Sequence, residues 1–384
     1  MSKIPKETKF VSYQGTNLIQ REAVVLQILE QMIEKPIPEG KVLSTTFGFK
    51  EENNHITGLA LNSKKLSSLP ESIGNLTKLE LLYLQDNKLS FLPESIGDLT
   101  NLKRLGLGRN KLSFLPESIG QLINLERLNL QENQLTSLPD SIGNLTQLKV
   151  LFLHKNQLTS LPDSIGNLIQ LKTELSLNSN QLSTFPESIG RLTNLIRLFA
   201  AGNQLTSLPE SIGQLTNLKK LALNKNNLTS LPDSIGNLGS LIYLGLGHNQ
   251  LTSLPESIGD LTKLYRIDLE GNNLKELPVS LGNLINLEIL KLYGNQLETV
   301  PDTIGQLTIL EELYLQENQL VSLPESLSSL KKLTLINLYN NKFTCLPDSV
   351  KQLESHGCKI CKTEEDLTPY TRGIGPYLFG RRRE

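Results

Sequence analysis

The feature that most constrains the fold of this 384-residue chain is a phrase of 23 residues that recurs from Ile56 to Phe343. The first copy carries Lys64 where the later copies carry asparagine, so the chain holds thirteen copies and the first one is atypical. A period of about 20–50 residues is typical of a solenoid, in which each repeat contacts only its neighbours. Every step is 23 residues, except the 24 from Asn156 to Asn180, along the series Asn87, Asn110, Asn133, Asn156, Asn180, Asn203, Asn226, Asn249, Asn272, Asn295, Asn318 and Asn341.

One copy, residues 79–102, indicates how each repeat folds. Leu82 and Leu84 are two residues apart, so they point to the same side of a short strand. Asn87 follows where the chain must leave the strand, and its amide can both donate and accept hydrogen bonds. Stacked copies should therefore form an asparagine ladder that satisfies the backbone groups of the turn.

The second half of the copy predicts a brief helical turn. Pro93 suits its first position, and Glu94 lies near the positive end of the helix dipole. Gly97 should then free the backbone to bend back. Stacking would place parallel strands ~4.8 Å apart on one side and the bulkier turns on the other, which leaves the strands on the concave face.

These residues, LxLxxNxL joined to LPxSIGxLTxL, resemble the leucine-rich-repeat superfamily. The similarity is closest to the 23-residue intracellular subclass of plant Ras-group-related proteins, SHOC-type scaffolds and the repeat blocks of Roco GTPases. The resemblance implies an α/β solenoid in the form of a right-handed horseshoe and a role as a signalling scaffold. It also implies a protein partner, such as a small GTPase, a kinase or a phosphatase. No GxxxxGK[ST] string occurs, so the GTPase module of Roco proteins is not expected.

Residues 1–55 are predicted to cap the first repeat. Apolar residues at helical spacing indicate an amphipathic helix over Asn17–Lys35, in which Asn17 and Gln20 resemble a capping box. Phe47–Lys50 and Ile56–Leu61 are predicted to form a hairpin that covers the open edge of the first coil.

The repeats are predicted to span residues 56–347, and residues 348–384 should form a C-terminal cap with a flexible basic tail. In that cap, Gly357–Cys361 is expected to form a last strand, and Glu364–Leu367 to fold over the final leucines.

Composition and charge favour a monomeric cytoplasmic protein. The net charge is -1, which gives no general attraction to nucleic acid or to an anionic membrane. The first ten residues, MSKIPKETKF, lack the apolar core of a signal peptide, and no apolar run reaches the ~18 residues that insertion into a bilayer needs. The cysteines are odd in number and clustered, as Cys345, Cys358 and Cys361, which suits a reducing compartment.

No catalytic or cofactor-binding constellation is predicted. Cys358 and Cys361 form a single C-x-x-C pair, which favours packing in the cap, although a metal site or redox chemistry stays open. The acidic residues that follow each proline recur with the repeat and match helix-dipole compensation. The four histidines are scattered, so no Ser-His-Asp grouping is indicated.

Recognition is expected at the outward strand positions, because they vary between copies whereas the inward leucines do not. Seven of the nineteen Tyr and Phe residues fall at these positions, and exposed aromatics with arginine are common interface anchors. Two groups of candidate partner-binding residues result. The first group is basic and aromatic and comprises Arg104, Arg127, Phe152, His154, Arg197, Phe199, Lys220, Tyr243 and Arg266. The second group is tyrosine-rich and comprises Tyr293, Tyr314 and Tyr339.

The basic group indicates a partner surface that carries carboxylates or phosphates. Five cations on a nearly neutral chain are a weak phosphate track, which argues against nucleic acid. The alternatives are a structural spacer whose outward residues have drifted without a partner, and a minor metal-binding role for the cysteine pair.

Overall fold

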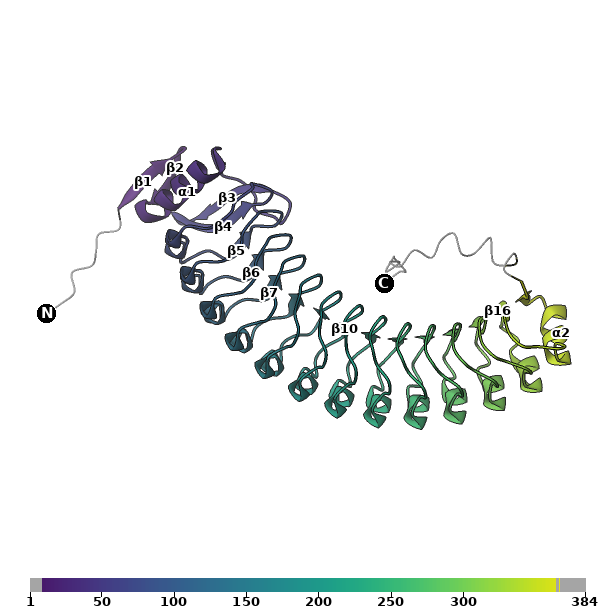
Figure 1. Ribbon diagram of the computed structural model, residues 1–384. Coiled ribbons are helices and arrows are strands. Elements are labelled where there is room, and N and C mark those ends of the chain that lie inside the picture. The colour runs from purple at the N-terminus through teal and green to yellow at the C-terminus, as the bar shows by residue number, and fades with distance from the viewer. Residues whose placement is uncertain (1–8, 364–365, 367–384) are drawn as a thin grey trace. The chain divides into compact units, whose positions relative to one another are not determined.

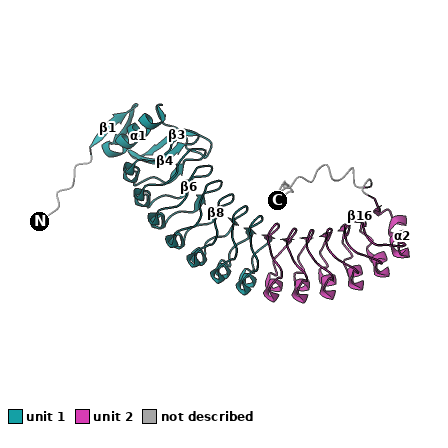
Figure 2. Ribbon diagram, in the orientation of Figure 1, with its two compact units in different colours: residues 1–220 teal, residues 221–384 magenta. Residues whose placement is uncertain are grey.

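A computed structural model describes residues 9–363 and residue 366 of the chain. The chain divides into two compact units, residues 1–220 and 221–384, shown in different colours in Figure 2.

Unit 1 begins with a cap of two hairpins and a helix. Strand β1 (Phe10–Tyr13) pairs antiparallel with β2 (Thr16–Ile19), and α1 (Gln20–Ile33) follows directly. The predicted second hairpin is confirmed as β3 (Phe47–Glu52) and β4 (His55–Leu61).

The predicted capping box at the start of α1 is wrong. Asn17 lies in β2, where it pairs with Ser12, so its side chain cannot cap a helix that begins three residues later. Ile19 occupies the N-cap position in an extended conformation and makes no side-chain cap hydrogen bond. Glu34 ends the helix with a φ of 51°, two residues before Pro36.

The repeats of unit 1 form a sheet that is parallel from β4 onward, with the strand order β3 to β10 following the chain. Leu82, Leu105 and Leu128 stand side by side in register, which gives the inward column of leucines predicted from the period. The repeat strands are β5 (Leu81–Tyr83), β6 (Arg104–Gly106), β7 (Arg127–Asn129), β8 (Val150–Phe152), β9 (Glu174–Ser176) and β10 (Arg197–Phe199). The division between the units falls within β11 (Lys220–Ala222).

Unit 2 continues the same pattern and ends with a helix and a strand. Its strands are parallel neighbours in chain order: β12 (Tyr243–Gly245), β13 (Arg266–Asp268), β14 (Ile289–Lys291), β15 (Glu312–Tyr314), β16 (Leu335–Asn337) and β17 (Lys359–Cys361). The predicted last strand is thus confirmed, with shorter bounds. The helix before it, α2 (Asp348–Ser355), was not predicted. The expected fold of Glu364–Leu367 and the basic tail lie outside the described residues, apart from Asp366.

Short 3-10 helices occupy the other side of the repeats in each unit (Figure 1). In unit 1 they are Glu71–Asn75, Glu94–Asp98, Glu117–Gln121, Asp140–Asn144, Asp163–Asn167, Glu187–Arg191 and Glu210–Gln214. In unit 2 they are Asp233–Asn237, Glu256–Asp260, Val279–Asn283, Asp302–Gln306 and Glu325–Ser329. The proline stands just before each helix in an extended conformation, with Pro93 at a ψ of 153°, rather than at its first position.

The role expected for Gly97 is wrong. Its φ does not lie in the left-handed region, so backbone freedom is not what this position requires. A Cβ atom there would lie 2.7 Å from the carbonyl oxygen of Ser118 in the next 3-10 helix. Glycine is needed because successive helices approach each other closely.

The asparagine ladder is confirmed. Asn110 accepts a hydrogen bond from the backbone N–H of Leu89 at 3.0 Å and donates to the carbonyl oxygens of Leu84 and Leu107, both at 2.9 Å. The side chain is buried, so each turn draws its hydrogen bonds from one amide shared with the preceding repeat. Each unit is therefore a solenoid with a leucine core, parallel strands on one side and 3-10 helices on the other.

Candidate binding surface

The outward side of the strands, here called the strand face, carries three exposed arginines in unit 1. Arg104 and Arg127 stand in register on the neighbouring strands β6 and β7, about 4.8 Å apart along the sheet. Arg197 stands at the same position of β10. The structure thus places these three predicted residues at the surface and in one column.

Two aromatic side chains accompany Arg127. Its guanidinium lies over the ring of Phe152, 5.1 Å from the ring centroid. Phe152 meets His154 edge to face, with centroids 6.3 Å apart, and His154 lies 3.3 Å from the Ser176 hydroxyl. Burial lowers the pKa of His154 from its ordinary value, so the ring is mainly neutral at pH 7. The site therefore offers an apolar edge beside a stacked cation.

Phe199 is not an exposed anchor. It is only 8% exposed, although sequence reasoning placed it among the surface aromatics. Phe199 is the last residue of β10, and outward side chains that precede it in the strand and follow it in the chain flank it on the same face. Ser176 at the same position of β9 is likewise buried. Lys220 is half-buried.

Charged residues on the flanks of the strands in unit 1 compensate one another between successive repeats. Just before the strands, Lys103 pairs with Glu80 at 2.8 Å and Lys149 with Glu126 at 3.0 Å. Just after them, Arg109 lies 3.4 Å from Asp86 and 3.6 Å from Glu132. Sequence reasoning missed both rows, although residues 23 apart alternate in sign.

The arginines of the strand face lack this compensation. Among the residues that the structure describes, neither Arg104 nor Arg127 takes part in a salt bridge, and Arg197 reaches the half-buried Glu174 only at 3.9 Å. On strands β5 to β10, all of them described, Glu174 is the single carboxylate at an outward position, against three arginines. This leaves a positive, partly aromatic strip on a chain whose net charge is -1.

In unit 2 the two predicted residues nearest the chain division are engaged internally. Arg266 donates to both oxygens of Asp268, at 2.8 and 2.9 Å. The Tyr243 hydroxyl donates to Asp268 Oδ2 at 3.1 Å, and burial raises the pKa of that hydroxyl. Arg266 is therefore a neutralised structural cation, and the sequence signal was Asp268, which lies two residues away on the same strand face.

The three tyrosines of the second group are half-buried on the strand face of unit 2. Tyr314 donates to Glu312 Oε2 at 3.0 Å, and the Lys291 ammonium lies 5.8 Å from the centroid of its ring. Burial raises the pKa of Tyr293 to about 12, with a smaller contribution from the Glu270 carboxylate. Tyr339 follows β16. Each of the three side chains is therefore only partly open to solvent.

The cysteine pair lies in and beside β17. Cys358 and Cys361 are both buried free thiols, and burial raises the pKa of Cys358 to about 11. Among the described residues, no group of three His, Cys, Asp or Glu side chains is placed to hold a metal ion.

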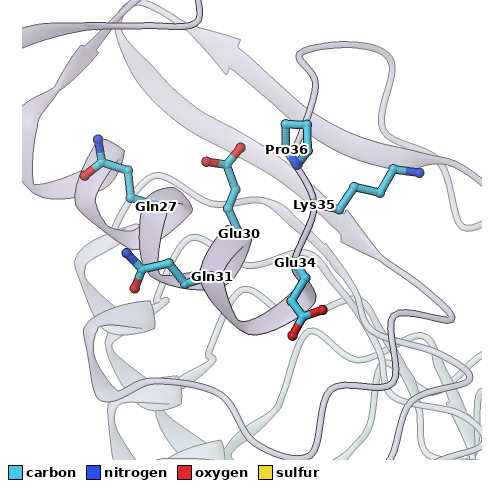
Figure 3. A pocket seen from close by; sticks show the side chains of 6 residues that line it. All are labelled: Gln27, Glu30, Gln31, Glu34, Lys35 and Pro36. Carbon is cyan, nitrogen blue, oxygen red and sulfur yellow. The ribbon is translucent and has the colours of Figure 1, made fainter.

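A shallow hollow lies along the second half of α1 (Figure 3). Glu30 lines it, but its carboxylate accepts hydrogen bonds from Gln14 Nε2 and from the backbone N–H of Ile37, both at 2.7 Å. This carboxylate anchors the cap and is occupied. In the described part of the chain, no helix has the length and apolar character needed to cross a membrane.

The sequence matches the profile described as "Leucine-rich repeat region" over residues 95–177, 164–242 and 233–317. Residues 54–112 and 310–330 match two further profiles, "Leucine rich repeat" and "Leucine Rich Repeat". The chain belongs to the leucine-rich-repeat family, as its motifs indicated. Proteins of this family are in general protein-interaction modules. A comparison with curated protein sequences gave no match.

Solved structures give the same assignment. A leucine-rich-repeat protein of Leptospira interrogans is 40% identical, with a TM-score of 0.72, over 82% of this chain and 81% of that one. The internalin InlF of Listeria monocytogenes shares the fold at 24% identity and a TM-score of 0.66, over 80% and 86% of the two chains. The plant peptide hormone receptor RGFR1, solved in complex with RGF2, is 30% identical with a TM-score of 0.53, over 82% of this chain and 58% of the receptor.

Proposed function

We propose that this chain is a non-enzymatic recognition module that binds a protein partner on its strand face, and that unit 1 receives an acidic segment of that partner. The observation that carries the proposal is the contrast between the arginines of the strand face and the cations around them. Lys103, Lys149 and Arg109 form salt bridges with carboxylates of neighbouring repeats, whereas Arg104 and Arg127 form none within the described residues.

The aromatic neighbour strengthens the proposal. A guanidinium stacked on Phe152 is held in place, so it loses little side-chain freedom when a carboxylate or phosphate group arrives. The half-buried ring beside it supplies apolar contact at the same point. Arginine with an aromatic residue is the composition typical of energetically dominant interface residues.

The kind of partner follows from the charge and from relatives. The plant receptor of similar fold was solved with RGF2 bound, which favours a polypeptide ligand. A cytoplasmic signalling role, with a small GTPase, kinase or phosphatase as partner, is the finer form of the proposal and rests on the subclass resemblance alone. A spacer without a partner would give no reason for the uncompensated column.

The test compares two double variants with the same change of charge. Arg104→Gln with Arg127→Gln removes two cations of the strand face, and Lys103→Gln with Lys149→Gln removes two compensated cations from nearby repeats. Capture of the cell's proteins by each form, followed by mass spectrometry and titration of each specific partner, should show at least about tenfold weaker binding for the arginine variant. Equal binding by both variants would mean that the arginines on the strand face of unit 1 do not contact the partner.

A further inference from the structure

Glu270 is a buried carboxylate of unit 2 with one unsatisfied oxygen atom. It follows β13 on the strand face of unit 2, and its side chain is 8% exposed. Among the described residues, its Oε2 atom has no hydrogen-bond partner. A buried carboxylate oxygen without a donor is unfavourable, and such an atom in a folded protein calls for an explanation.

The immediate surroundings compensate Glu270 only in part: its own backbone N–H, Lys291 and Arg266 favour the carboxylate, and burial and Asp268 outweigh them. Arg266 and Tyr243 both donate hydrogen bonds to the nearby Asp268, so the Arg266 guanidinium is directed to that carboxylate. Lys291 lies over the ring of Tyr314 and forms no salt bridge within the described part of the chain. Burial and the Asp268 carboxylate both raise the pKa of Glu270, as expected for a second negative charge beside the first.

The Glu270 carboxylate lies over a glycine of the preceding repeat. Glu270 Oε1 lies 2.3 Å from the place that a Cβ atom of Gly247 would take, so the carboxylate rests over an outward position without a side chain. On the same flank, Gly271 and Gly294 adopt φ values of 62° and 66° where unit 1 carries its compensating charges. The His248 ring lies over Gly271, with its Nδ1 atom 2.6 Å from the place that a Cβ atom would take.

Tyr293 stands one repeat further along, and the negative charge of Glu270 acts on its hydroxyl. An aromatic ring beside an unpaired carboxylate is suited to a cationic side chain, because the ring attracts the cation and the carboxylate pairs with it. The two groups that would contact the cation are the Glu270 carboxylate, which lies over Gly247, and the Tyr293 ring.

We propose that Glu270 and Tyr293 form a receiving site for a basic side chain, arginine or lysine, of a polypeptide partner. The arriving group donates to Glu270 Oε2, which gains the hydrogen bond that it lacks in the free protein. The site lies within unit 2 and depends on residues different from the arginines of unit 1, so it stands independently of the acidic-segment proposal.

The experiment titrates the whole chain with a peptide of alternating arginine and glycine, and with the same peptide carrying citrulline, which keeps the shape but not the charge. Wild type should bind the arginine peptide at least about tenfold more tightly than Glu270→Gln, and the citrulline peptide should bind neither. Glu276→Gln is the matched control, since it removes one negative charge from an exposed position of unit 2. It should bind like wild type.

A second measurement separates recognition from a structural role. If the carboxylate is unpaired in the free protein, Glu270→Gln should unfold at a higher temperature than wild type, whereas Glu276→Gln should leave the midpoint unchanged. Lower thermal stability of Glu270→Gln, or equal peptide affinity for the Gln variants at positions 270 and 276, would overturn the proposal. Loss of binding in the Arg104 and Arg127 double variant would bear only on unit 1.

Discussion

The guanidinium of Arg127 lies over the ring of Phe152, and the two side chains come from the adjacent parallel strands β7 and β8. This contact joins a charge that no salt bridge in the described residues neutralises to an apolar surface that is half open to solvent. Neither side chain is required by the leucine core, which lies on the opposite side of the sheet. The pair is therefore the point of unit 1 at which binding and stability should separate most clearly.

Phe152→Ala should weaken partner binding while changing stability little. Removing the ring takes away the surface on which the guanidinium rests, so we expect a loss of roughly 1–2 kcal/mol in binding, a factor of about 5 to 30. Titration of the captured partner measures this loss, and the midpoint of thermal unfolding serves as the check on folding. A variant that binds normally would show that the stacked pair lies outside the contact area.

The asparagine ladder allows a sharper prediction about stability. Asn133 is buried, accepts a hydrogen bond from Leu112 N–H at 3.0 Å and donates to the carbonyl oxygens of Leu107 and Leu130. Asn133→Ala leaves these groups unpaired inside the protein, which should cost roughly 1–3 kcal/mol of unfolding free energy.

The matched control for that change is Asn124→Ala. Asn124 is exposed and donates one hydrogen bond to the Thr100 carbonyl oxygen at 2.8 Å, where water can replace it. Urea unfolding should show a shift below about 0.5 kcal/mol for this variant. Equal shifts for both alanine variants would mean that the ladder does not contribute more than a surface amide.

The 3-10 helices predict a contrast between two glycines. Gly97→Ala places a methyl group 2.7 Å from the Ser118 carbonyl oxygen, so neighbouring helices must move apart, at about 1–3 kcal/mol. Gly239→Ala meets nothing within 4 Å and should be neutral or stabilising by about 0.4–1 kcal/mol. Urea midpoints of the two variants should therefore move in opposite directions or differ clearly in size. Similar midpoints would show that the close approach of neighbouring helices is not the reason for glycine at position 97.

Much of the fold follows from the 23-residue period, because a column of identical residues can be satisfied only by stacking. The leucine core, the asparagine hydrogen bonds and the strand positions were predicted for this reason, and the structure has them. The β1–β2 hairpin was not predicted from the sequence. In the structure its turn residues Gln14 and Gly15 both adopt the positive φ values typical of a two-residue turn. It occurs once in the chain, so no periodicity points to it.

The candidate site was predictable only in part, because charge balance depends on which neighbours a side chain reaches. The sequence period places Arg127 and Arg266 at the same outward strand position of their repeats, so it does not distinguish between them. Only the geometry shows that Arg266 is held by both oxygens of Asp268 and that Phe199 is largely buried, whereas Arg127 forms no salt bridge among the described residues. The unpaired oxygen of Glu270 has no sequence signal, since it depends on the path of one side chain over Gly247.

The cysteines give a prediction that depends on exposure and on pKa together. Cys345 is exposed, whereas Cys358 and Cys361 are buried. Only the thiolate reacts with a disulfide reagent, and burial raises the pKa of Cys358 to about 11, so about one in a thousand of its molecules is ionised at pH 8. The native protein should therefore release one equivalent of chromophore quickly, and three after denaturation, with Cys345→Ser abolishing the fast phase. If Cys345→Ser still reacts quickly in the native state, the C-terminal pair is open to solvent, and its packing within the cap is refuted.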